Sequence, residues 1–305
     1  KDLSLDEKKT VGAQINSLRD SVDSLIKGKL LEIRKNEINS KLLNESIDIS
    51  FPPPTSLDAK VHPISKTFDE VISIFGSMGY AVAEGPDIET DFYNFSALNI
   101  PEDHPAREMQ DTFYIEDQDE ENKSYVLRTH TSPVQIRTML SQEPPIKIIA
   151  PGRTYRCDSD ATHSPMFHQV EGLFISENAN MSDLKGTLIE FCKQFFEVQD
   201  LKVRFRPSYF PFTEPSAEMD IAYHVKNNTL HIGEGDKWLE ILGCGMVNPV
   251  VLENCKIDNS IYQGFAFGMG LDRITMLKHG LTDIRAFFNG NLNWINQNGF
   301  GLGDY

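Results

Sequence analysis

The sequence predicts an α+β fold, in which an antiparallel β-sheet is flanked by helices and preceded by one long amino-terminal helix. Strand-like segments dominate beyond about residue 80, and they lack the regular strand–helix alternation that a parallel sheet requires. Prolines fall inside some of these segments, which is typical of antiparallel sheets with free edges. The first 45 residues differ, because their apolar residues recur at helical spacing.

This amino-terminal helix is predicted over residues 3–45, which contain no proline. Its apolar residues are spaced four and three apart, the a/d pattern of a coiled coil: Val11, Ile15, Leu18, Val22 and Leu25. One apolar stripe cannot bury itself, so we expect a partner helix upstream of Lys1 or in another molecule. Residues 1–50 are therefore assigned to a coiled-coil helix that we expect to be truncated here.

A proline run, Phe51-Pro-Pro-Pro54, follows the helix and predicts a stiff linker over residues 51–63. The compact domain is expected over residues 64–305. It should open with a helix from Lys66 to Met78 that stops at Gly79, then a strand from Tyr80 to Ala83. Further helices are predicted at Ser132–Ser141, Met181–Glu197 and Leu271–Lys278.

The composition of the chain excludes some classes of protein. The chain has 305 residues, 40% of them apolar, which is ample for a packed core. No run approaches the roughly 18 apolar residues of a membrane span, so a membrane protein is excluded. Lys and Arg number 29 against 45 Asp and Glu, a net charge of −16. Such a chain binds nucleic acid poorly unless local basic contacts or a partner help.

The four cysteines are widely separated and form no CxxC pair. This pattern indicates reduced thiols and predicts a cytoplasmic protein. Neither a signal peptide nor a basic transit segment is expected at the amino terminus.

The most informative segment runs from Gly152 to Phe174 and is predicted as strand, polar loop and strand. Gln169 and Glu171 are two residues apart and so share one face of the second strand. Arg156 ends the first strand, and His163 lies in the loop. Together these groups could converge on a ligand that is both anionic and amine-bearing, such as an amino acid joined to a nucleotide phosphate.

Three other segments carry candidate binding residues. Phe210 and Phe212 share a face if their segment is extended and could meet a substrate ring edge-to-face, although buried phenylalanines are more often core residues. Arg273 follows a glycine-rich strand in the first turn of a helix, where phosphate is favoured, although such a turn alone is weak evidence. An isolated histidine is more often a hydrogen-bonded core residue, but His130 precedes Thr131 and Ser132 at a helix start, which favours a ligand-binding role.

These segments resemble a known family when they are read together. Arg156 followed by Asp158 is similar to motif 2 of class II aminoacyl-tRNA synthetases, and the string from Thr162 to Gly172 resembles the alpha subunit of bacterial phenylalanyl-tRNA synthetase. Segments 127–133, 209–215 and 264–273 resemble that family's substrate-binding turn, phenylalanine pocket and motif 3, and 79–86 its motif 1. The likeness runs in the family's order from about Gln14 to Phe288.

The resemblance implies a class II catalytic domain that activates L-phenylalanine with ATP and transfers it to the 2′-OH of the terminal adenosine of tRNA(Phe). It places Arg156, as the catalytic residue, on the α-phosphate and His163 and Arg273 on the leaving pyrophosphate, with Glu171 also part of the ATP site. It assigns the amino acid to seven residues: His130, Ser132, Gln169, Glu171, Phe210, Phe212 and Ala266.

The resemblance also implies Mg²⁺, with Glu214 sharing a magnesium ion with a beta subunit, and an assembly of two alpha and two beta chains. Because the chain is acidic, we expect the beta subunit and the amino-terminal arm to supply much of the tRNA binding. Two features depart from the family pattern and receive no function: Asn248 and the Asn- and Gly-rich segment 289–305.

Two alternatives stay open from the residues alone. The chain could be another class II synthetase, although the paired phenylalanines favour an aromatic substrate. It could instead be a catalytically silent paralogue that only binds ligands. The joint presence of Arg156, Glu171 and Arg273 argues against a silent paralogue.

Overall fold

The computed structural model describes residues 5–44, 59–108, 111–119, 122–157, 164–226 and 229–301. The chain divides into two compact units, with the boundary between Asp58 and Ala59. Within the described ranges, no helix combines the length and apolarity that crossing a bilayer needs.

The first unit contains helix α1 (Leu5–Asn44), so the predicted amino-terminal helix is confirmed. The apolar residues of its predicted seam are exposed in this unit, Leu18 by 66% and Leu25 by 73%. One ion pair, Lys29–Glu32 at 2.8 Å, joins adjacent turns and adds little stability at full exposure. These apolar residues of α1 are thus not buried by other described residues of this unit.

The second unit is built from short helices around a large sheet. Its helices are α2 (Pro63–Ser77), α3 (Asp91–Asn94), η1 (Ser96–Leu98), η2 (Pro105–Arg107), α4 (Ser132–Ser141), α5 (Met181–Phe196), α6 (Pro249–Asn254), α7 (Leu271–His279), η3 (Ile284–Phe287) and α8 (Leu292–Asn298). Its strands are β1 (Lys60–Val61), β2 (Ala81–Val82), β3 (Ile88–Glu89), β4 (Tyr114–Gln118), β5 (Ser124–Leu127), β6 (Ile146–Tyr155), β7 (Met166–Ser176), β8 (Val203–Phe210), β9 (Thr213–Lys226), β10 (Thr229–Ile232), β11 (Lys237–Val247), β12 (Gln263–Gly270) and β13 (Phe300–Gly301).

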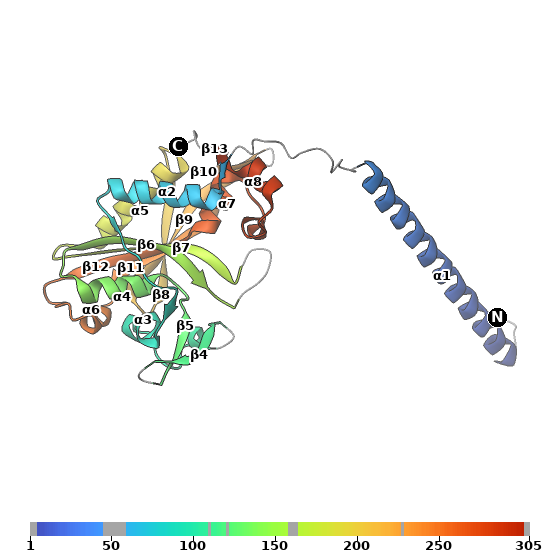
Figure 1. Cartoon of the computed structure of the whole chain (residues 1–305), viewed down its shortest axis with the longest axis horizontal. Helices are drawn as coiled ribbons and strands as arrows, with labels where there is room; N and C mark the ends of the chain where they lie inside the picture. The colour runs from blue at the N-terminus through green and yellow to red at the C-terminus, as the bar shows by residue number, and fades with distance from the viewer. Residues whose placement is uncertain are drawn as a thin grey trace. The chain divides into compact units, whose positions relative to one another are not determined.

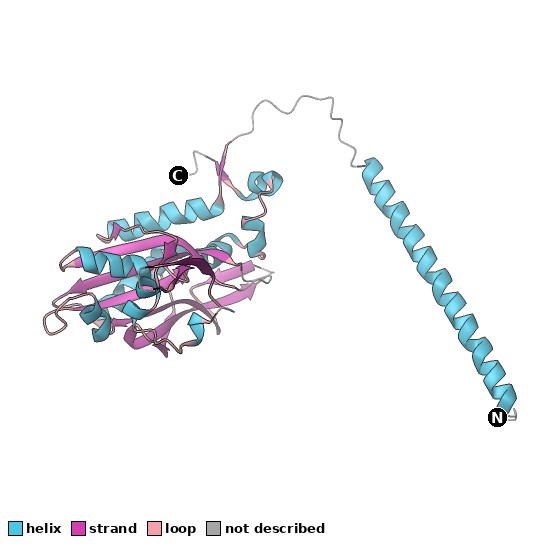
Figure 2. Ribbon diagram, turned by 60° about the horizontal axis from the view of Figure 1, so that its bottom comes forward, coloured by secondary structure: helices cyan, strands magenta, loops and turns pink. Residues whose placement is uncertain are grey.

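The central sheet has eight strands in the order β10-β9-β11-β12-β7-β6-β2, with β8 also paired to β9. Its pairings are antiparallel except at the edge, where β2 runs parallel to β6. The predicted antiparallel α+β architecture is therefore confirmed. Figure 2 shows the long strands running together through this unit.

Helices α2, α5 and α7 cover one face of the sheet (Figure 1). The core between these layers is rich in aromatic rings, among them Phe75, which is stacked on Phe191 and on Phe267 at 4.7 and 5.2 Å. Helix α2 begins at Pro63, before the expected Lys66, because His62 accepts a hydrogen bond from the Ile64 N–H and Pro63 suits the first turn.

The other face of the sheet is covered by α4, α6 and η1, which bury a second apolar cluster. Helix α4 has the predicted bounds, and α5 and α7 end within one residue of theirs. The small sheet β3-β5-β4 adjoins this layer. Strand β1 pairs with β13, so the beginning and the end of the unit meet.

Candidate active site

A cavity of about 640 Å³ opens between the sheet and the layer of α4, α6 and η1. Strands β7, β11 and β12 form its floor, and the turn between β8 and β9 forms one wall. Residues 95–106 contribute another wall through Phe95, Leu98 and Ile100. The cavity is therefore assembled from segments that are distant in sequence.

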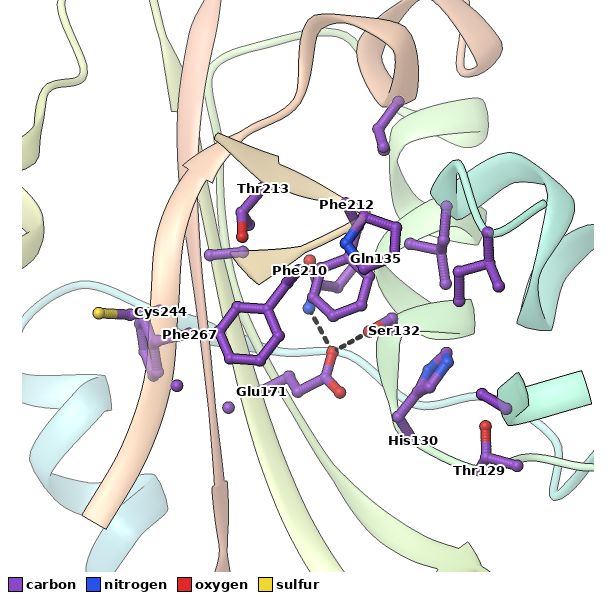
Figure 3. Close-up of a pocket in the computed structure, with 18 of the residues that line it drawn as sticks. Thr129, His130, Ser132, Gln135, Glu171, Phe210, Phe212, Thr213, Cys244 and Phe267 are labelled. Atoms are coloured by element: carbon purple, nitrogen blue, oxygen red, sulfur yellow. Dashed lines mark hydrogen bonds between the residues drawn. The ribbon is translucent and has the colours of Figure 1, made fainter. Parts of the chain in front are cut away.

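A buried carboxylate stands at the centre of the polar floor. Glu171 is 5% exposed and accepts hydrogen bonds from the Ser132 hydroxyl at 2.5 Å and the Gln135 amide at 2.6 Å. Figure 3 shows these two side chains converging on Glu171. The Gln169 amide donates to the same carboxylate at 3.0 Å, so the predicted shared face of Gln169 and Glu171 is confirmed.

Burial raises the pKa of Glu171 to about 7, although its hydrogen-bond donors oppose the rise. The Thr131 N–H, at the start of α4, also donates to this carboxylate at 3.2 Å. A carboxyl group with such a pKa is near its midpoint at neutral pH, so a cation that enters the cavity can tip it to the ionised form.

Arg128 holds the start of α4 against β6. Its buried guanidinium donates to the Arg153 carbonyl at 2.7 Å and to the Gly85 carbonyl at 3.1 Å, and it pairs with Asp87 at 3.2 Å. The segment that carries His130 and Ser132 is thus fixed to β6, the strand that Arg156 follows.

Two lining groups lack hydrogen-bond partners among the described residues. Both ring nitrogens of His130 and the Oε1 atom of Gln169 are buried and unpaired. Burial and then the nearby Arg156 lower the pKa of His130 to about 3, so its imidazole is neutral. Buried polar atoms without partners are uncommon in proteins, and these can accept or donate to a ligand.

The apolar end of the cavity holds two parallel rings. The ring centres of Phe210 and Phe212 lie 5.8 Å apart at an interplanar angle of 9°, with Pro211 between the two residues in the chain. The Phe210 ring lies against Gly243, where a Cβ atom would come within 2.9 Å of it. Ala266 contributes to the lining on the sheet side. This end of the cavity is therefore lined by aromatic and apolar groups.

Arg156 provides a positive charge at the cavity. It follows β6, its side chain is exposed, and its Nε donates to the Thr129 carbonyl at 3.2 Å. Its guanidinium lies 5.1 Å from the centre of the Phe167 ring. The cavity therefore presents a cation, a carboxylate with an adjacent amide, and paired aromatic rings.

Comparison with known proteins decides the family. Residues 46–298 match the model of the class II tRNA synthetase core domain (F), and residues 1–42 match the class II aminoacyl-tRNA synthetase N-terminal domain. The chain is 56% identical over 300 residues to the phenylalanine–tRNA ligase alpha subunit of Beijerinckia indica. The chain belongs to the phenylalanine–tRNA ligase alpha subunits of class II.

Other alpha subunits show the same degree of similarity. Identity is 56% over 298 residues with that of Rhodospirillum centenum and 55% over 298 residues with that of Caulobacter vibrioides. Each alignment, like that with Beijerinckia indica, covers 98% of this chain and 83% of the relative. This alpha subunit is accordingly a ligase of the aminoacyl-tRNA synthetase type.

Most of the residues predicted for the site line the cavity of this alpha subunit: His130, Ser132, Arg156, Gln169, Glu171, Phe210, Phe212 and Ala266. Arg273 and Glu214 do not. Arg273 is exposed in the first turn of α7, three residues beyond Gly270, which pairs with Gln169. Glu214 is exposed near the start of β9. His163 lies outside the described residues.

Several lining residues were not predicted. Gln135 contacts Glu171, and its position three residues after Ser132 on one helix face could have indicated it. Glu218 and Glu240 also line the cavity and pair with Arg206 at 2.8 and 3.2 Å. For these carboxylates and for segment 95–111, no local pattern in the sequence points to the site.

The described residues of the site supply only part of the ligand set that a metal ion needs. In the ranges that the structure describes, no group of three or more His, Cys, Asp or Glu side chains could hold an ion. Mg²⁺, however, needs only one or two carboxylates when substrate phosphates and waters complete its shell. The exposed Glu214 carboxylate is compatible with one such ligand.

Proposed function

We propose that this alpha subunit activates L-phenylalanine with ATP and transfers it to the 2′-OH of the 3′-terminal adenosine of tRNA(Phe), releasing AMP and pyrophosphate. The observation that carries the proposal is the cavity itself, in which the polar group around Glu171 lies beside the stacked rings of Phe210 and Phe212. A zwitterion with a phenyl side chain matches both ends.

The polar floor would hold the amino acid by its charged groups. The ammonium pairs with ionised Glu171 and donates to the unpaired Oε1 of Gln169. Ser132 and the neutral His130 complete the polar contacts, and Phe210, Phe212 and Ala266 enclose the ring. Positioning of this kind accounts for a large share of catalysis in a reaction between two bound substrates.

Activation would proceed by in-line attack of the phenylalanine carboxylate on the α-phosphorus of ATP, with pyrophosphate leaving. Arg156 neutralises the charge that develops on the α-phosphate, which is the largest contribution expected from a single group here. Arg273 and His163 are proposed to hold the leaving pyrophosphate. Mg²⁺ supplies further charge neutralisation, and Glu214 would share an ion with the beta subunit.

The partners proposed are a beta subunit, in an assembly of two alpha and two beta chains, and tRNA(Phe). The net charge of −16 opposes tRNA binding by the alpha subunit alone, so the beta subunit and α1 are assigned much of it. A cytoplasmic location fits the reduced cysteines and the proposed tRNA substrate.

Phenylalanine-dependent exchange of pyrophosphate into ATP, measured with the beta subunit present, tests the proposal. Exchange that depends on phenylalanine and not on other amino acids is the expected result. A protein that binds phenylalanine without exchange would be a silent binding module, and exchange that depends on a different amino acid would assign another substrate.

Substituting Ala266→Gly should admit larger rings, because it removes a methyl group from the cavity lining. We expect kcat/KM for para-chlorophenylalanine to rise about tenfold, in line with the energy of one methylene-sized contact. Pyrophosphate exchange with both amino acids measures it. Ala222→Gly, in the buried part of β9 outside the cavity, is the control, and equal selectivity in the two variants would place Ala266 away from the ring.

A further inference from the structure

The paired rings are carried by a very short turn. Phe210 ends β8, Thr213 begins β9, and only Pro211 and Phe212 lie between them. The two rings are parallel within 9°. Because only two residues connect the strands, the backbone conformation of this turn determines the positions of both rings.

The carbonyl of Pro211 is held by two asparagine side chains. The Asn99 amide donates to it at 2.8 Å, and the Asn248 amide donates at 3.3 Å. The Asn248 N–H also donates to the Phe212 carbonyl at 2.9 Å. The turn is therefore fixed from outside its own hairpin, by residues that are distant in the sequence.

Both asparagines are neighbours in sequence of residues that line the cavity. Asn99 lies between Leu98 and Ile100, which both line the cavity, and it adopts a left-handed conformation with φ 60°. Asn248 caps α6 by accepting from the Val250 N–H at 3.0 Å. A third residue, Asn254 at the end of α6, donates to the Ala97 carbonyl at 3.2 Å.

These three residues form a closed set of contacts, here named the asparagine clasp: Asn99, Asn248 and Asn254. The clasp joins η1 to α6 and both of these elements to the turn. Neither Asn99 nor Asn248 lines the cavity, so they act on a ligand only through the residues that they hold.

We propose that Asn99 and Asn248 are positioning residues that set the aromatic specificity of this alpha subunit. By holding Pro211, they fix the separation between the Phe210–Phe212 pair and the wall of Leu98 and Ile100, and hence the width available to a substrate ring. This inference rests on the proposed function, in which the phenylalanine ring occupies this end of the cavity.

Substituting Asn248→Asp separates the two roles of that side chain. The carboxylate keeps an oxygen that can cap α6, but it loses the amide donor and turns an acceptor toward the Pro211 carbonyl. Asn99→Asp removes the other donor in the same way. Asn180→Asp is the matched control, because Asn180 caps α5 and donates to the Asn178 carbonyl at 3.1 Å, outside the cavity.

The assembled ligase is assayed by pyrophosphate exchange with phenylalanine, tyrosine and para-chlorophenylalanine. For Asn248→Asp and Asn99→Asp we expect the KM for phenylalanine to rise about tenfold, the loss expected for a removed hydrogen bond. Preference for phenylalanine over the two larger substrates should fall, while the KM for ATP stays unchanged. Asn180→Asp should match the wild type in all of these measurements.

Two outcomes would overturn the inference. One is an unchanged preference in both clasp variants, relative to Asn180→Asp. The other is a parallel rise in the KM values for ATP and phenylalanine together with a lower Tm, which would show a merely structural role. If Asn248→Asp does not fold, Asn248→Ser replaces it, because serine retains a hydroxyl that can cap α6 but is too short to reach Pro211. Its preference for phenylalanine is then compared with that of Asn99→Asp. Wild-type protein without phenylalanine-dependent exchange would instead refute the proposed function.

Discussion

Substituting Arg156→Ala is expected to lower phenylalanine-dependent pyrophosphate exchange by about 10³-fold, the upper end of the loss seen when one group that stabilises transition-state charge is removed. Arg156 is exposed and lines the cavity, and its positive charge is proposed to neutralise the α-phosphate. We expect alanine to leave the fold intact, because Arg156 is exposed and is not a buried core residue. The exchange rate at saturating ATP and phenylalanine measures the effect.

Arg153→Ala is the control for this experiment. Arg153 is an exposed arginine on β6, three residues earlier, and it does not line the cavity. It should retain exchange within a small factor of the wild type. Normal exchange by Arg156→Ala would remove Arg156 from the mechanism.

The second large effect is a dependence of phenylalanine binding on pH. The pKa of Glu171 is raised from 4.5 to about 7 by burial, so the group is mostly ionised at pH 8 and mostly protonated at pH 6. Only the ionised form can pair with the substrate ammonium. The KM for phenylalanine should therefore rise about tenfold as the pH falls from 8 to 6, as the loss of the ionised fraction requires.

Glu171→Gln should remove this pH dependence and raise the KM at pH 8 by about 10²-fold, because a buried partner of the ammonium is lost. Glu177→Gln, an exposed carboxylate just beyond the same strand, should keep the wild-type profile. The KM for ATP is measured over the same pH range, so that effects of protonating the nucleotide can be separated from the effect on phenylalanine binding. A flat profile for the wild-type protein between pH 6 and 8 would contradict the assignment.

Local signals in the sequence were enough to predict α1, α2, α4, α5 and α7 and the shared face of Gln169 and Glu171. Proline, glycine and asparagine at their ends gave the bounds of α4, α5 and α7 closely. The two-residue period of a strand placed Gln169 and Glu171 on one face, and their amide and carboxylate are in contact at 3.0 Å. These features depend on neighbours within a few residues, so they are visible without the fold.

The rest of the site depends on contacts between distant segments. Ser132 reaches Glu171 across 39 positions, and Asn99 reaches Pro211 across 112. No period or motif encodes such contacts, because the packing of α4, α6 and η1 on the sheet creates them. The raised pKa of Glu171 is equally invisible beforehand, since it comes from burial by these layers.

The pairing of β1 with β13 has a consequence for synthesis on the ribosome. Lys60 lies opposite Gly301, so the first strand of the catalytic unit waits for a partner that is translated much later. At about 5–20 residues per second, this delay amounts to roughly 10–50 seconds. Throughout that interval the backbone groups of Lys60 and Val61 cannot make the β1–β13 hydrogen bonds, so this pairing closes the unit only after Gly301 has been added.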